Sequence, residues 1–115
     1  MTDMHIDHRV LRDLQDVMEE GYLQLLETFL QDSEQRLSQL HGARTTTELS
    51  MAAHSFKGSS SNMGAIGLAN LCQQLEERIK ERTPCGIEEL IHRIDQEYLV
   101  VQRFYRGERE RVSAS

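Results

Sequence analysis

One stretch of the sequence, AAHSFKGSSSNMGA at residues 52–65, places a histidine beside a cation and unusually small residues. His54 offers a ring nitrogen that can act as a nucleophile, and Lys57 offers a positive charge that can neutralise an anion held on that ring. Gly58 and Ser61 add little bulk next to them. Residues three, four and seven positions along a helix share one side, so we expect these four residues to form one surface.

The direction of this surface follows from the helical period. On a wheel that starts at Leu49, the apolar residues of the segment lie within about 60° of that residue, whereas His54 lies about 140° away. The histidine is therefore expected to point away from the core. Glycine inside a helix costs about 1 kcal/mol relative to alanine. Because small residues let another backbone come close, this local loss of helix stability indicates clearance for a partner.

A carboxylate is expected opposite the histidine on the next helix. If the chain reverses around Ala65, antiparallel packing places Glu76 opposite His54, because both lie the same number of residues from the turn. Glu76 could then accept a hydrogen bond from one ring nitrogen and leave the other nitrogen free. A slip of one residue would bring Leu75 or Glu77 opposite instead.

Five helical segments must position these residues. Apolar spacing and punctuation predict a short helix that begins near Asp7 and ends near Gly21, followed by longer helices over about 22–40, 45–64, 65–80 and 86–105. Residues 107–115 are polar and are expected to form a frayed tail. Four long amphipathic helices with short loops predict an all-α fold: an antiparallel up-down four-helix bundle, with the short first helix as a lid on one end.

Size and composition exclude several classes of function. The chain has 115 residues, enough for one domain over residues 1–115, and its formal net charge is −6. Without a concentrated basic face, nucleic-acid binding is disfavoured. The sequence has no run of about 18 apolar residues and no apolar leader, so we expect a cytoplasmic protein that neither spans nor binds a membrane. No additional apolar stripe indicates an oligomer, so we expect a monomer.

Cysteine and metal chemistry are both disfavoured. Cys72 falls on an apolar helical stripe and Cys85 falls in a loop, and neither has metal-site spacing, so both are expected to be free thiols. The candidate metal ligands are His5, Asp7 and His8 near the N-terminus, and Glu89 with His92. The second pair has the spacing used in di-iron bundles, but such bundles need that motif twice and the sequence has it once. No metal site is therefore expected.

Residues 53–76, AHSFKGSSSNMGAIGLANLCQQLE, resemble the signature of histidine-containing phosphotransfer (HPt) domains, A-H-x-[LF]-K-G-[SA]-[SA]-x-x-[LM]-G-A-x-x-L-x-x-x-C-x-x-L-E. Upstream, LLETFLQDSEQRLSQL resembles the preceding helix of that family, so the resemblance covers most of the chain. An ATP-binding domain or a receiver domain would not fit in the remaining residues. The resemblance is therefore to the stand-alone bacterial type, the HptB-like proteins.

The resemblance implies a phosphorelay function. His54 would accept a phosphoryl group from the phosphoaspartate of a receiver domain, as in hybrid histidine kinases, and pass it to the aspartate of a response regulator. Lys57 would be the cation beside the phosphoryl group, Gly58 would leave room for it, and Glu76 would orient the ring. The protein would need no cofactor and no ATP-dependent kinase activity of its own, because the partner receiver domain supplies Mg²⁺.

The same resemblance implies that receiver domains dock on the third and fourth helices. The candidate docking residues border the small-residue surface or the following turn, or lie on the first helix: Gly58, Ser61, Met63, Gly64, Ala65, Val10 and Leu14. The alternative is a non-catalytic helical adaptor that binds partners without carrying phosphate. Such an adaptor would function normally with glutamine in place of His54.

Overall fold

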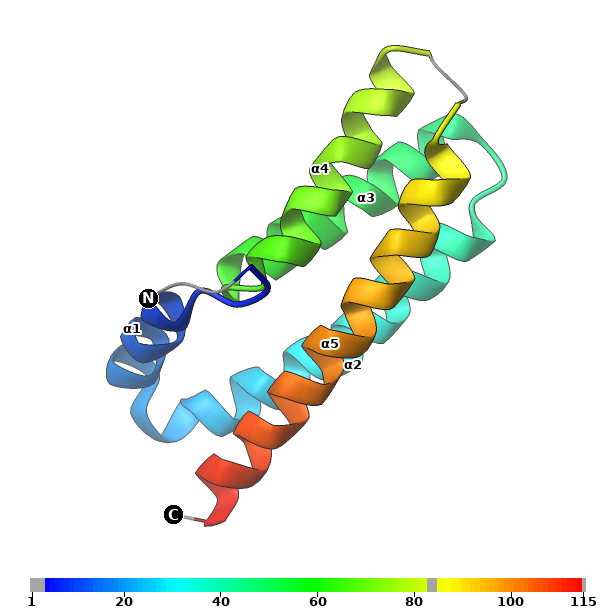
Figure 1. The fold of residues 1–115 in the computed structure, drawn as a ribbon. Coiled ribbons are helices and arrows are strands. Elements are labelled where there is room, and N and C mark those ends of the chain that lie inside the picture. The colour runs from blue at the N-terminus through cyan, green and yellow to red at the C-terminus, as the bar shows by residue number, and fades with distance from the viewer. Residues whose placement is uncertain (1–3, 83–84, 115) are drawn as a thin grey trace.

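The computed structural model describes residues 4–82 and 85–114. Its elements are α1 (His8–Met18), the short 3-10 helix η1 (Glu19–Gly21), α2 (Tyr22–Gly42), α3 (Thr46–Asn62), α4 (Ile66–Lys80) and α5 (Ile87–Ala114). Helices α2 to α5 form an antiparallel bundle in which each packs against the next, and α5 packs back against α2 (Figure 1). Helix α1 lies at one end. The predicted all-α four-helix bundle with a short extra helix is confirmed.

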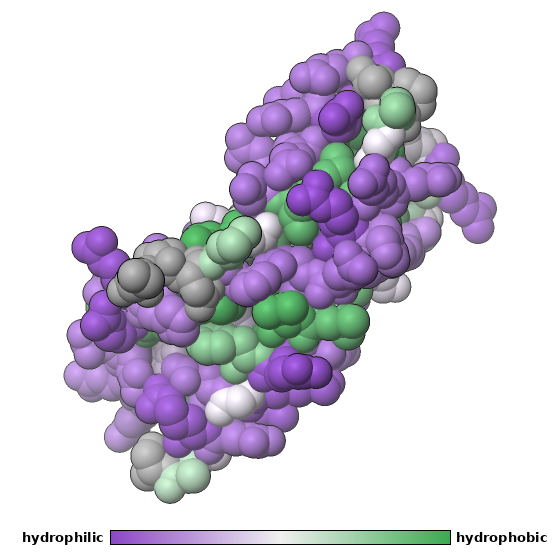
Figure 2. Space-filling model, viewed as in Figure 1, coloured by the Kyte–Doolittle hydropathy of each residue, from purple (hydrophilic) through white to green (hydrophobic). Residues whose placement is uncertain are grey.

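Apolar side chains from all four bundle helices form one core. The largest fully buried ones include Tyr22 and Leu26 on α2, Phe56 on α3, Leu68 and Leu75 on α4, and Ile94, Val101 and Tyr105 on α5. Figure 2 shows that most of the viewed face is hydrophilic, with hydrophobic residues gathered along its middle. Within the described part of the chain, no helix is both long and apolar enough to cross a membrane. The packing of the core determines which face of α3 is exposed to solvent.

Helix α3 begins with a side-chain N-cap at Thr45. The Thr45 side chain accepts a hydrogen bond from the backbone N–H of Glu48 at 3.1 Å. The Glu48 carboxylate in turn accepts one from the backbone N–H of Arg44 at 2.8 Å. One unpaired backbone donor of the first turn is thereby satisfied, and the residue before the N-cap is tied to the same turn, which fixes where α3 starts.

The turn between α3 and α4 is closed by a Schellman motif. The N–H of Ala65 donates to the carbonyl of Ser60 at 2.8 Å, and the N–H of Gly64 donates to the carbonyl of Ser61 at 3.1 Å. Gly64 has φ +83°, a left-handed conformation that favours glycine. This turn sets the register in which α4 packs back against α3.

The N-terminal segment is tied to the same turn by backbone hydrogen bonds. The N–H of Asp7 donates to the carbonyl of Gly64 at 2.7 Å, and the N–H of Gly67 donates to the carbonyl of His5 at 3.3 Å. The Asp7 side chain caps α1 by accepting from the N–H of Arg9 at 3.1 Å. Helix α1 is therefore held beside the α3–α4 turn.

The C-terminal end of α5 differs from the prediction. The sequence predicted a helix to about residue 105 and a frayed tail over 107–115, but α5 continues to Ala114. The Glu108 carboxylate accepts a hydrogen bond from the Tyr22 hydroxyl at 2.7 Å and two from the Arg111 guanidinium at 2.8 and 2.9 Å. Arg111 also donates to Gln15 on α1 at 3.3 Å. These contacts to α1 and α2 hold the polar extension in helical form.

Replacing Gly64 by alanine should destabilise the fold by more than about 1 kcal/mol. The reason is that φ is +83° there, and an added Cβ would lie 2.9 Å from the backbone oxygen of Asp7. Gly58→Ala is the matched control, because nothing lies within 4 Å of its added Cβ, and it should stabilise the helix by about 0.5–1 kcal/mol. Urea denaturation measures both changes, and equal stabilities would contradict the role of the turn.

Candidate functional site

His54 lies near the middle of α3, and 71% of its side-chain surface is accessible. Gly58 and Ser61, which were predicted to share its surface, are exposed on the following turns of the same helix. A Cβ added at Gly58 would meet no atom within 4 Å. The surface beside the ring is therefore low and open, as the sequence predicted.

A shallow depression continues this open surface from α3 onto α4. Its volume is about 460 Å³, and it is lined by Lys57, Gly58, Ser61, Asn62, Ala69, Asn70 and Gln73. Six of these seven side chains are uncharged, and most are small or medium in size. A partner that approaches His54 from this side meets polar groups and little steric obstruction.

Glu76 on α4 contacts the histidine as the register argument predicted. The Nδ1 atom of His54 lies 3.1 Å from Oε2 of Glu76. The carboxyl group is nearly buried, because Glu76 is only 7% exposed, whereas the histidine ring is open to solvent. The α3–α4 turn therefore brings a buried acid under an exposed base.

Lys57 also binds this carboxylate, which the sequence argument did not foresee. Its Nζ atom lies 2.9 Å from Oε1 of Glu76, so the two carboxylate oxygens hold different partners. The sequence argument considered Lys57 only as a neighbour of His54 on one helix. The signal was available, because the register that brings Glu76 opposite His54 also brings it within reach of a residue one turn farther along.

The charge of Glu76 determines which ring nitrogen of His54 donates the hydrogen bond. Burial alone would raise the pKa of Glu76, but the hydrogen bonds from Lys57 and His54 outweigh it and lower that pKa below its ordinary value. Glu76 is therefore ionised and can only accept, so Nδ1 of His54 must donate. A neutral ring then carries its lone pair on Nε2.

Cys72 lies beneath this cluster and stays a thiol. Burial, reinforced by the negative charge of Glu76, raises the pKa of Cys72 to about 12. Both Cys72 and Cys85 are free, as the sequence predicted. A buried neutral thiol is a packing group of the core and not a nucleophile at this site.

Comparison with known proteins identifies the family of this chain. Residues 24–103 match the Hpt domain family. The chain belongs to the Hpt family. It is similar to the crystal structure of histidine-containing phosphotransfer protein B (HptB) from Pseudomonas aeruginosa PAO1, with 44% identity over 93% of this chain and 96% of that one and a TM-score of 0.89. No curated protein matches the chain.

Membership of the Hpt family defines the general role of the chain. Hpt domains are histidine phosphotransfer intermediates that work with receiver domains in phosphorelays. The cluster around His54 fits this role, since it presents an exposed imidazole with one nitrogen engaged and a cation nearby. The resemblance inferred from residues 53–76 is confirmed.

Three of the predicted docking residues of the Hpt domain are buried. Met63 is 5% exposed, Ala65 is fully buried, and Gly64 lies beneath the N-terminal segment, so none of the three is exposed on the free chain, and their contact with a receiver domain stays a prediction. Met63 falls on the core side of α3, and its carbonyl accepts a hydrogen bond from the Tyr105 hydroxyl. Val10 and Leu14 on α1 are half-buried and remain candidate contacts.

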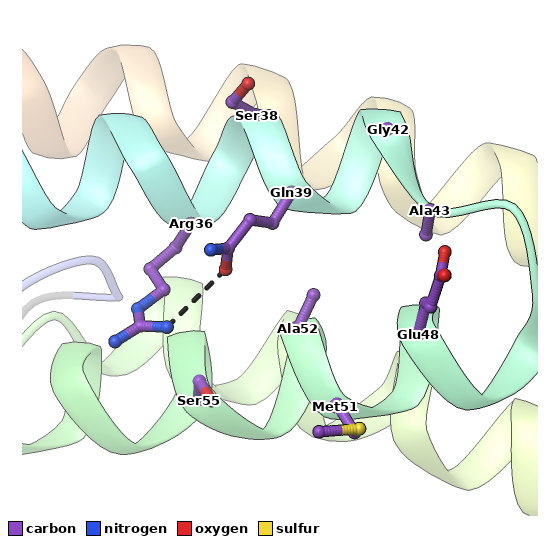
Figure 3. Close-up of a pocket in the computed structure, with 9 residues that line it drawn as sticks. All are labelled: Arg36, Ser38, Gln39, Gly42, Ala43, Glu48, Met51, Ala52 and Ser55. Atoms are coloured by element: carbon purple, nitrogen blue, oxygen red, sulfur yellow. Dashed lines mark hydrogen bonds between the residues drawn. The ribbon is translucent and has the colours of Figure 1, made fainter.

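A groove on the other flank of the His54 helix was missed by the sequence argument. It lies between α2 and α3, has a volume of about 540 Å³, and is lined by Arg36, Ser38, Gln39, Gly42, Ala43, Glu48, Met51, Ala52 and Ser55 (Figure 3). Met51 is 66% exposed and lies one turn before His54. An exposed methionine on this face of the wheel is a signal that the sequence argument could have used.

Two other histidines of the Hpt domain each pair with a carboxylate. Nδ1 of His5 lies 2.8 Å from Oε2 of Glu97, and Nε2 of His41 lies 2.6 Å from Oδ1 of Asp95. Over residues 4–82 and 85–114, no group of three or more histidine, cysteine, aspartate or glutamate side chains could hold a metal ion. The imidazole–carboxylate pair thus recurs in this fold, and at His54 the carboxylate also binds Lys57.

The lowered pKa of Glu76 predicts a pH dependence of stability. The ionised carboxylate stabilises the fold above its ordinary pKa of 4.5, and this contribution is lost as the pH falls through the lower pKa of the folded state. Glu76→Gln removes the titrating group. The difference in unfolding free energy between wild type and variant should therefore narrow as the pH falls below 4.5.

Urea denaturation at neutral and acidic pH measures that difference. Glu77→Gln is the matched control, because Glu77 lies next in the chain but is exposed and faces Gln73. A Glu76→Gln difference that is the same at both pH values would contradict the assigned charge state.

Proposed function

We propose that His54 is the phosphoacceptor of this Hpt domain and that it carries the phosphoryl group on Nε2. The proposal is carried by one observation: Nδ1 is engaged by the buried carboxylate of Glu76 while the ring itself is exposed. A ring held in this way has a fixed tautomer and presents its lone pair to solvent. Glu76 would thus act as the group that orients the imidazole.

The proposed reaction moves one phosphoryl group between a receiver domain and His54. The Nε2 lone pair forms the N–P bond while the acyl O–P bond of the phosphoaspartate breaks in line, and that electron pair returns to the receiver's carboxylate. The Nδ1 proton stays in its hydrogen bond to Glu76, so no proton has to move. The reverse step delivers the group to the aspartate of a second receiver domain.

The other residues of the site would lower the barrier by charge and by shape. Lys57 supplies a positive charge for the phosphoryl oxygens, and Gly58 and Ser61 leave room for the incoming receiver domain. The receiver domain brings its own Mg²⁺, which neutralises charge on the transferring group. The Hpt chain would need no cofactor and would have no ATP-dependent kinase activity of its own.

The donor would be the receiver domain of a hybrid histidine kinase, and the acceptor would be the receiver domain of a response regulator. Because both partners carry the same kind of domain, one docking face on the Hpt domain can serve both in turn. This exchange requires a monomer whose His54 face is free, and it takes place in the cytoplasm.

Docking would use apolar contacts on both sides of His54. Met51 is exposed one turn before the histidine, and Val10 and Leu14 lie on α1 beside the α3–α4 turn. A receiver domain that reaches Nε2 must also cover the surface one turn away, so Met51 falls within its footprint. Burying an exposed methionine against an apolar partner residue would stabilise the complex.

The phosphoacceptor assignment is tested with His54→Gln and a receiver domain phosphorylated by acetyl phosphate. Wild type should acquire acid-labile label, whereas the variant should acquire none and should keep its fold and its binding to the receiver domain. Label retained in the variant would rule out His54. A variant that supports signalling as well as wild type would favour the non-catalytic adaptor.

The docking contact is tested with Met51→Glu. This substitution should slow phosphotransfer from the receiver domain by about tenfold, in the range of residues that dominate an interface. Labelling by phosphoramidate, a small phosphodonor that needs no docking, should not change. Leu99→Glu on α5 is the control, since Leu99 is similarly exposed at 64% but lies on another helix. Equal receiver-transfer rates for wild type and Met51→Glu would refute the contact.

A further inference from the structure

The two carboxylate oxygens of Glu76 contact two different basic side chains. Oε2 accepts from Nδ1 of His54 at 3.1 Å, and Oε1 lies 2.9 Å from Nζ of Lys57. The carboxyl side chain is 10% exposed and the lysine side chain is 30% exposed. In the unphosphorylated protein, the cation assigned to the phosphoryl group is therefore already engaged elsewhere.

The ion pair with Glu76 holds Lys57 away from the place where a phosphoryl group would lie. The ammonium group and Nδ1 both meet the Glu76 carboxylate, which lies on α4 beneath the ring. Nε2 lies on the opposite edge of an imidazole from Nδ1, and here it belongs to an exposed ring. A phosphoryl group on Nε2 would therefore lie away from Oε1, and Lys57 would have to leave Glu76 to contact it closely.

We propose that Lys57 exchanges partners, binding Glu76 in the resting protein and the phosphoryl group once His54 is phosphorylated. The inference rests on the proposed function and adds a second role for Glu76. This carboxylate would hold the lysine in reserve as well as orienting the histidine.

Charge balance explains how the lysine can leave a nearly buried carboxylate. A buried carboxylate without a cationic partner is costly, so Lys57 could not simply depart. When the neutral ring forms the N–P bond at Nε2 and keeps its Nδ1 proton, the ring becomes a cationic phosphoimidazolium. Its Nδ1–H already points at Glu76. The ring therefore replaces Lys57 as the counter-ion at the moment when the phosphoryl oxygens need the lysine.

The exchange would also keep the phosphoryl group transferable. Glu76 stabilises the cationic form of the ring, from which the N–P bond breaks to leave a neutral imidazole. It also competes with the phosphoryl oxygens for Lys57. The first effect keeps the ring in the form whose N–P bond breaks readily, and the second weakens the contact of Lys57 with the phosphoryl oxygens. Replacing Glu76 with a neutral residue of the same shape should therefore make phosphohistidine last longer.

The test uses phosphoramidate as the phosphodonor and follows the decay of label at His54 at neutral pH. Glu76→Gln should lengthen the lifetime of phosphohistidine by about fivefold, the change in rate expected for one partly exposed ion pair. Glu77→Gln is the control and should leave the lifetime unchanged. Thermal unfolding verifies that both variants are folded. An unchanged or shorter lifetime in Glu76→Gln would overturn the inference.

The same substitution in a Lys57→Met background distinguishes the lysine exchange from simple repulsion between Glu76 and the phosphoryl group. If Lys57 exchanges, Glu76→Gln should lengthen the lifetime less in a Lys57→Met background than in wild type. The same fold-change in both backgrounds would overturn the exchange while leaving His54 as the phosphoacceptor. Absence of label at His54 in wild type would instead refute the proposed function and with it the inference.

The exchange of Lys57 can also be followed by NMR in the protein without substitutions. The chain has two lysines, Lys57 and Lys80, so lysine-selective ¹³C labelling gives two sets of side-chain NMR signals. Phosphorylation by phosphoramidate should shift the Cε signal of Lys57 and leave that of Lys80, exposed at the end of α4, in place. A Lys57 signal that does not move on phosphorylation would overturn the exchange.

Discussion

A nearly buried carboxylate is the constraint on which the site depends. Glu76 is ionised beneath the surface, and such a charge is tolerated only with partners in good geometry. His54 and Lys57 can both reach it only if α4 packs against α3 in one register. The Schellman turn at Gly64 sets that register. The shape of one tight turn therefore determines the tautomer of a histidine several turns away.

Helix α3 combines a weak outer face with a strong inner one. The outer face gives up helix propensity at Gly58 and the neighbouring serines to keep the approach to His54 open. The inner face buries Ala53 and Phe56 completely. Tertiary packing thus supplies the stability that the local sequence lacks, and a reactive side chain can lie on a regular helix without a loop to expose it.

The sequence predicted those features that depend on local periodicity and counting. Counting residues from a turn at Ala65 brought Glu76 opposite His54, and the helical wheel turned the histidine outward. The same wheel placed Met63 on the core side, so its burial followed from the pattern although it was interpreted as a docking residue. The ion pair between Lys57 and Glu76 depends on the conformation of the lysine side chain. The hydrogen bond to Glu108 comes from Tyr22, which lies far away in the sequence. The register brings Lys57 within reach of Glu76 but does not determine which group its flexible side chain binds, and periodicity carries no signal for the bond between Tyr22 and Glu108.

The way in which α1 is attached to the bundle affects how the protein sequence could change during evolution. Backbone groups of His5, Asp7, Gly64 and Gly67 form the hydrogen bonds that hold the N-terminal segment at the α3–α4 turn. These bonds do not depend on the identity of the exposed side chains of α1. In the proposed docking mode, substitutions there would change which receiver domains are recognised without altering the cluster around His54. Duplicated copies of such a gene could therefore acquire separate signalling partners through a few surface changes on one short helix.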